Sequence, residues 1–129
     1  MVRKRFTPAD ANRTLPLVKR IVADLLERGR ELRALPPKAT DPTSRQRARE
    51  VEAEIRDLLS ELERIGCSYK DWGFDVGLVD FPAQIGGQEV LLCWRSDEPQ
   101  VAWYHEPEAG FAGRTPIPEA LLGDRTAAR

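Results

Sequence analysis

The periodicity of the apolar residues changes at Gly66, and this change constrains the fold more than any other feature of the chain. Before Gly66, apolar residues recur at steps of three and four, the spacing of one face of a helix. After it, short runs of strand-forming residues are separated by glycine and proline, which is typical of strands joined by tight turns. The sequence therefore predicts an α+β protein, with a helical hairpin over residues 7–66 and a small antiparallel sheet over residues 67–118.

The first helix is predicted to begin near Pro8, with Thr7 as its N-cap, and to reach about residue 35. Pro16 should make this helix kink or restart near residues 14 and 15, because proline lacks the N–H that an interior helical position donates. The apolar seam of the helix consists of Leu15, Val18, Val22, Leu25, Gly29 and Leu32. This seam predicts one face turned toward a core.

A second helix is predicted after the proline-rich loop 36–42. Thr43, with Gln46 three residues later, has the spacing of a capping box, and Gly66 suits the left-handed residue that ends a helix. Its seam consists of Ala48, Val51, Ile55, Leu58, Leu62 and Ile65. Two seams of this length cannot bury themselves, so we expect the hairpin to pack on the sheet, on a second copy of the chain, or on both.

The sheet is predicted to be a three-stranded antiparallel meander over residues 77–84, 88–95 and 100–106. The Gly86-Gly87 pair suits a two-residue turn, and residues 96–99 a four-residue turn. With these turns the core face carries Val79, Phe81, Ala83, Val90, Leu92, Trp94, Val101, Trp103 and His105. The other face carries Leu78, Asp80, Pro82, Leu91, Cys93, Arg95, Ala102, Tyr104 and Glu106. A bulge at either turn would shift the register by one residue and exchange the faces.

His105 is the only histidine, and with Asp80, Cys93, Glu106 and Glu108 it offers ligand types that suit a divalent metal such as zinc. The predicted register opposes this site, since it places His105 on the face opposite Asp80 and Cys93. A histidine at the end of an apolar strand is also commonly a hydrogen-bonded core residue, and an isolated cysteine in a strand is commonly a buried thiol. Both interpretations stay open from the sequence.

Asp80, Arg95, Glu98 and Arg114 form a second set of candidates, for binding a ligand. Asp80 in the middle of a strand needs a partner, and an ion pair with Arg95 or contact with a ligand would each supply one. Arg114 follows a glycine-rich loop whose backbone amides suit an anion. An acidic ligand bound by Arg114 and the basic helices is therefore a third possibility.

The charge and composition exclude several classes of protein. The net charge is −1, so no overall basic character favours nucleic acid. The longest apolar run, residues 90–94, is far shorter than a membrane span, and no signal peptide is recognisable at the start, so we expect a cytoplasmic protein. In that compartment the two cysteines, Cys67 and Cys93, should be free thiols.

Several motifs together resemble a bacterial family, the domain of unknown function 2203. They are Phe6-Thr7-x-x-x-Ala11-Asn12-x-x-Leu15-Pro16-Leu17, Gly77-Leu78-Val79-Asp80-Phe81-Pro82, Leu92-Cys93-Trp94, His105-Glu106 and Gly110-Phe111-x-Gly113-Arg114-x-Pro116. The resemblance covers nearly the whole chain and implies that Asp80, Cys93, Glu98, His105 and Arg114 belong to the family pattern. The family has no assigned activity, so the resemblance implies no catalytic residue.

The sequence thus favours one domain over residues 1–129, with residues 119–129 as a flexible tail. It lacks a nucleotide-binding loop, a dinucleotide fingerprint and a His-Glu-x-x-His motif. We predict a non-enzymatic interaction module that forms a homodimer through its helical hairpin, in the manner of a coiled coil. The alternative is a small metal-binding protein with a site near His105.

Overall fold

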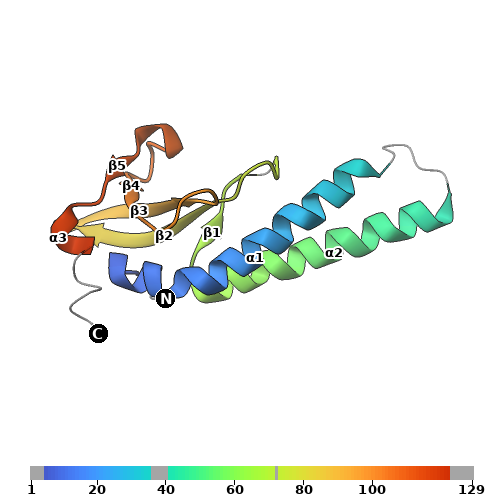
Figure 1. Ribbon diagram of the computed structural model, residues 1–129, viewed down its shortest axis with the longest axis horizontal. Coiled ribbons are helices and arrows are strands. Elements are labelled where there is room, and N and C mark those ends of the chain that lie inside the picture. Colours follow the sequence, from blue (N-terminus) through green and yellow to red (C-terminus); the bar gives the residue numbers. More distant parts are fainter. Residues whose placement is uncertain (1–4, 36–40, 72, 123–129) are drawn as a thin grey trace.

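The computed structural model describes residues 5–35, 41–71 and 73–122 and has the predicted α+β architecture. Its elements are α1 (Pro8–Ala34), α2 (Pro42–Ile65), β1 (Ser68–Tyr69), β2 (Leu78–Ile85), β3 (Gln88–Arg95), β4 (Trp103–His105), the 3-10 helix η1 (Phe111–Gly113), β5 (Thr115–Pro116) and α3 (Glu119–Leu122). Helices α1 and α2 lie side by side as the predicted hairpin, whose far end extends well beyond the sheet (Figure 1).

The start of α1 is confirmed as predicted. The Thr7 hydroxyl accepts the Asp10 N–H at 3.0 Å, and the Asp10 carboxylate accepts the Thr7 N–H at 3.4 Å. The helix then runs through Pro16 without interruption, so no second helix restarts there. A bend at Pro16 stays a prediction.

The start of α2 differs from the prediction, because Asp41 and not Thr43 is its N-cap. The Asp41 carboxylate accepts the Ser44 N–H at 2.9 Å, and Pro42 takes the first helical position, where its missing N–H costs nothing. The other end is confirmed, since Gly66 adopts a left-handed φ of 111°. Residues 36–40 of the predicted loop lie outside the described residues.

The sheet has five antiparallel strands in the order β1-β2-β3-β4-β5, and not the three that were predicted. The two added strands are two-residue edge strands, which are too short to leave a periodic signal in the sequence. The Gly86-Gly87 turn is confirmed, with left-handed φ values of 60° and 81°. The predicted register of β2 and β3 is also correct, because Val79 pairs with Trp94 and Asp80 with Cys93.

The predicted register of β4 is wrong by one residue, because Leu91 pairs with His105 and Cys93 with Trp103. The shift follows from a contact with α1. The side-chain amide of Asn12 accepts the Val101 N–H at 2.7 Å and donates to the Val101 carbonyl at 3.0 Å, and so anchors Val101 to the helix. Held there, the chain does not enter the sheet until Trp103. His105 and Trp103 therefore lie on the face predicted for Asp80 and Cys93, opposite to the core.

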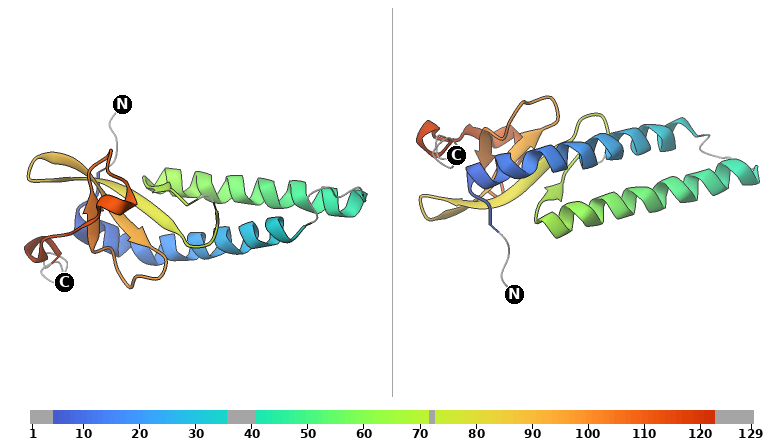
Figure 2. Two further views of the ribbon diagram at one scale, coloured as in Figure 1. Left: turned by 90° about the horizontal axis from the view of Figure 1, so that it is seen from above. Right: turned by 60° about the horizontal axis from the view of Figure 1, so that its bottom comes forward.

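The core lies between this sheet and the helical hairpin. Figure 2 shows the N-terminal half of α1 crossing one face of the sheet, while the segment between β4 and β5 lies over the other face. Phe6 packs edge-on against Phe81, with ring centroids 5.1 Å apart, and its N–H donates to the Pro82 carbonyl at 2.7 Å. Fully buried core side chains include Val18, Leu25, Val51, Leu62, Phe81, Leu92 and Trp94.

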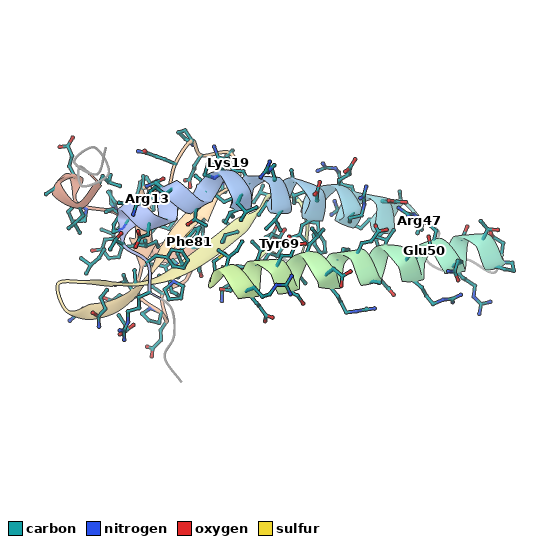
Figure 3. All side chains as sticks on the ribbon, turned by 90° about the horizontal axis from the view of Figure 1, so that it is seen from below. Arg13, Lys19, Arg47, Glu50, Tyr69 and Phe81 are labelled. Atoms are coloured by element: carbon teal, nitrogen blue, oxygen red, sulfur yellow. The ribbon has the colours of Figure 1, made fainter. Side chains whose placement is uncertain are left out.

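The far end of the hairpin has no sheet to pack on and is held by ion pairs between its helices. Arg47 binds the Glu31 carboxylate through two N–H groups, at 2.6 and 2.9 Å, and lies 3.3 Å from Glu50 on its own helix (Figure 3). These side chains are partly exposed, so each pair contributes little to stability.

The structure describes the first four residues of the predicted tail. Residues 119–122 form α3, and Leu121 and Leu122 pack against the core. The rest of the predicted tail, residues 123–129, lies outside the described residues. Among the helices of the described chain, none combines the length and the apolar character that crossing a membrane requires.

Candidate metal centre

Three neighbouring strands each contribute one polar side chain to the same spot on the outer face of the sheet. Asp80 on β2 pairs directly with Cys93 on β3, and His105 on β4 is diagonal to Cys93, because it pairs with Leu91 two residues away. Possible ligand atoms of Asp80, Cys93 and His105 all lie within 4.8 Å of one another. All three residues are buried, with exposed fractions of 3%, 1% and 3%.

The hydrogen bonds of His105 determine which ring nitrogen faces the other two residues. Nδ1 lies 2.8 Å from the backbone carbonyl of Glu106, which can only accept a hydrogen bond, so Nδ1 carries a proton and donates it. Nε2 lies 3.3 Å from the Asp80 carboxylate. The backbone therefore fixes the tautomer of the neutral ring and leaves Nε2 as the atom available to a metal.

Asp80 binds His105 and not Arg95, so the predicted ion pair between Asp80 and Arg95 is wrong. Arg95 on β3 pairs with Leu78 on β2, and its guanidinium binds Asp97 at 2.6 and 2.7 Å. Burial raises the pKa of Asp80, and its interactions with His105 only partly oppose this effect. A hydrogen bond between Nε2 and the Asp80 carboxylate requires one proton, since the other nitrogen of the ring donates to Glu106.

Cys93 is a protonated thiol in this environment. Burial, followed by the nearby Asp80 charge, raises its pKa to about 12. A thiol with such a pKa is a poor nucleophile at neutral pH, so the site does not resemble a cysteine-based catalytic centre. A bound cation would reverse this preference, because metal coordination favours the thiolate.

Glu106 and Glu108, predicted as further ligands, do not join this group. Within the described part of the chain, the only cluster of three or more potential ligand side chains is that of Asp80, Cys93 and His105. Both glutamate residues are exposed, and Glu106 contributes its backbone carbonyl instead. The three clustered residues line a cavity of about 290 Å³ together with Lys70, Leu78, Leu91, Pro107, Gly110 and Phe111.

Arg114 and Glu98, predicted to bind a ligand, bind each other beside the candidate metal centre. Their side chains form an ion pair of 2.7 Å in which both are mostly buried, and Arg114 also donates to the Cys93 carbonyl at 3.4 Å. The guanidinium lies over the rings of Trp103 and Phe111, at 4.9 and 4.6 Å from their centroids. Arg114 therefore fastens the segment between β4 and β5 to the sheet.

Comparison with known families agrees with the resemblance of the motifs. The profile of an uncharacterized conserved protein family, DUF2203, matches residues 4–117. The chain belongs to the DUF2203 family. No curated protein and no solved structure matches the chain significantly.

The part of the chain matched to DUF2203 contains the whole cluster of Asp80, Cys93 and His105, the Arg114–Glu98 pair and the lining of the cavity. The sequence predicted all three clustered side chains as candidate ligands. The predicted register of β4, however, placed His105 on the face opposite Asp80 and Cys93. Lys70 and Phe111 were not predicted as cavity residues. Lys70 follows an edge strand of two residues, and Phe111 lies in a short 3-10 helix, so neither position has a periodic pattern that places it.

Proposed function

We propose that this DUF2203 protein binds a divalent transition metal of the zinc type through Asp80, Cys93 and His105. The observation that carries the proposal is the convergence of three different ligand types, from three strands, within 4.8 Å in a buried position. Buried polar groups cost free energy unless they have partners, so such a cluster requires a reason. A metal ion would satisfy all three residues at once.

The chemistry of the ligand atoms narrows the choice of metal. Calcium and magnesium prefer ligand sets made of oxygen atoms, whereas zinc accepts sulfur, nitrogen and oxygen together. The hydrogen bond from His105 to the Glu106 carbonyl is the kind of second interaction that orients a histidine ligand. When bound, a zinc ion would supply Lewis acidity, and three protein ligands are typical of sites that keep one position open.

The decisive experiment is measurement of zinc stoichiometry and affinity in purified protein. Wild-type protein should hold about one zinc per chain after loading and desalting, as three-ligand zinc sites do. His105→Ala and Cys93→Ala should each lose it. Cys67→Ala is the matched control, because Cys67 is also buried but donates to the Leu62 carbonyl and lies outside the cluster.

Two results would contradict the proposal. One is wild-type protein that takes up no stoichiometric metal, whether zinc, cobalt or nickel. The other is a His105→Ala variant that retains metal as tightly as wild type, since this would place the metal elsewhere on the chain. Circular dichroism of each variant separates loss of the ligand from loss of the fold.

We further propose that the chain forms a homodimer through its hairpin, as an interaction module. Support comes from the far half of the hairpin, which extends beyond the sheet (Figure 1) and carries the partly buried residues Leu26 and Leu32. Leu17 on α1 is also 43% exposed. Light scattering after size-exclusion chromatography tests this proposal, and a monomer at high micromolar concentration would contradict it.

A further inference from the structure

We infer that the cavity over the metal centre takes a small organic monoanion, a carboxylate with a compact apolar body, whose charge Lys70 binds. This inference rests on the proposed metal centre and adds the chemical class of its ligand. It follows from three properties of the cavity: its size, the charge of its lining and the position of its apolar side chains.

The cavity is small and already formed. Its volume of about 290 Å³ is at the lower end of ligand pockets, which typically measure about 300–1,000 Å³. This size suits a single ring or a short branched chain and excludes a nucleotide or a folded peptide. The walls come from β2, β3, β4 and the segment between β4 and β5, and Arg114 fastens that segment to the sheet.

Lys70 gives the lining its positive charge. A divalent metal held by a carboxylate, a thiolate and a neutral imidazole has a net charge of zero, so the Lys70 ammonium leaves the lining with a charge of one. The described chain gives Lys70 no carboxylate at ion-pair distance, whereas the other cations of this face are paired. Lys70 interacts electrostatically with Asp80. A metal bound to Asp80 would neutralise the charge of that carboxylate.

The position of Lys70 is fixed by its backbone, whose N–H donates to the Leu78 carbonyl at 2.8 Å beside β1 and β2. Arg114, which the sequence suggested as the anion-binding residue, is not equivalent, because Glu98 compensates its charge at 2.7 Å. Lys70 is therefore the cation of this cavity that a ligand can use.

The apolar part of the lining predicts the body of the ligand. The apolar lining around Lys70 and the three clustered side chains consists of Leu78, Leu91, Pro107 and Phe111. Phe111 is 38% exposed and is one of two large apolar side chains that are exposed among the described residues. An apolar ring or branched chain would cover it, which is the usual reason for an exposed aromatic residue beside a cavity.

Calorimetric titration of the zinc-loaded protein with benzoate tests this inference, with benzyl alcohol as the neutral analogue of similar size. Benzoate should bind, and Lys70→Met should weaken it by about tenfold or more, the loss expected for one charge-assisted contact. Lys70→Arg should restore most of the affinity. Lys19→Met is the matched control, because Lys19 lies on α1 and its ammonium contacts the Pro99 carbonyl, away from the cavity.

The outcomes distinguish this inference from the metal proposal. Zinc stoichiometry is measured in the same samples and should stay near one in Lys70→Met, since Lys70 is not a ligand. If the zinc-loaded protein does not bind benzoate, or if Lys70→Met binds it as tightly as wild type, the inference is wrong but the metal proposal stands. Equal affinity for benzyl alcohol also overturns the inference, and protein that takes up no zinc overturns both proposals together.

Discussion

Zinc binding should release about two protons near pH 7, because two of the three ligand positions hold a proton in the metal-free protein. The first is on Cys93, whose pKa is raised to about 12, so its thiol is almost entirely protonated. The second lies in the contact between His105 Nε2 and Asp80, since His105 Nδ1 donates to the Glu106 carbonyl and a hydrogen bond at 3.3 Å needs one proton. A metal ion must displace both.

The pH dependence follows directly from this count. Each proton released makes the apparent dissociation constant fall about tenfold per pH unit, so zinc should bind about 100-fold more tightly at pH 7 than at pH 6. The sign is fixed by the raised pKa of Cys93: the protonated form dominates without metal, so affinity rises with pH. Removing one of the two protons should reduce the dependence to about tenfold per unit.

Calorimetry in buffers with different ionisation enthalpies measures the protons released, as the slope of observed enthalpy against buffer enthalpy. Asp80→Asn should release about one proton, since it removes one of the two protonated positions. Cys67→Ala should release two, like wild type. A slope near zero in wild type would refute the assigned protonation, and so would an unchanged slope in Asp80→Asn.

Three further predictions concern the metal-free protein. Iodoacetamide at pH 8 should alkylate Cys93 about 1,000-fold more slowly than an ordinary thiol, because the pKa of Cys93 is raised from 9.0 to about 12. The rate is measured in a Cys67→Ala variant, and a rate like that of a free thiol would contradict the burial of Cys93. Asn12→Ala should lower the free energy of unfolding, measured by urea denaturation, by about 2–4 kcal/mol, because it leaves the N–H and the carbonyl of Val101 without their partner. A change below about 0.5 kcal/mol would show that this contact does not anchor the chain. Arg114→Met and Glu98→Gln should each cost about 1–3 kcal/mol, and the double variant should cost less than their sum, since each single change leaves a mostly buried charge unpaired; strict additivity would argue against the pair.

The local features of the fold could be predicted from the sequence because their causes are local. The Gly86-Gly87 pair determines a two-residue turn, and this turn determines the register that places Asp80 opposite Cys93. The capping box at Thr7 depends on a residue only three positions away. Each of these features has its partners within one short stretch of sequence.

The candidate site could not be predicted, because its assembly depends on distant contacts. The anchor of Val101 on Asn12 joins residues 89 positions apart, and no periodicity indicates it. It delays the start of β4, which brings His105 to the face of Asp80. The pairing of Arg114 with Glu98 likewise joins residues 16 positions apart, on either side of β4.

The short stretch between the Val101 anchor and His105 limits how the length of the chain can change at this point. Loops normally tolerate single insertions, because their ends can adjust without affecting the elements they join. Here an odd change in the number of residues between the Val101 anchor and His105 would turn the imidazole toward the helices, whereas an even change would leave it on the outer face. The parity of this stretch therefore decides whether His105 can join Asp80 and Cys93 on the outer face of the sheet.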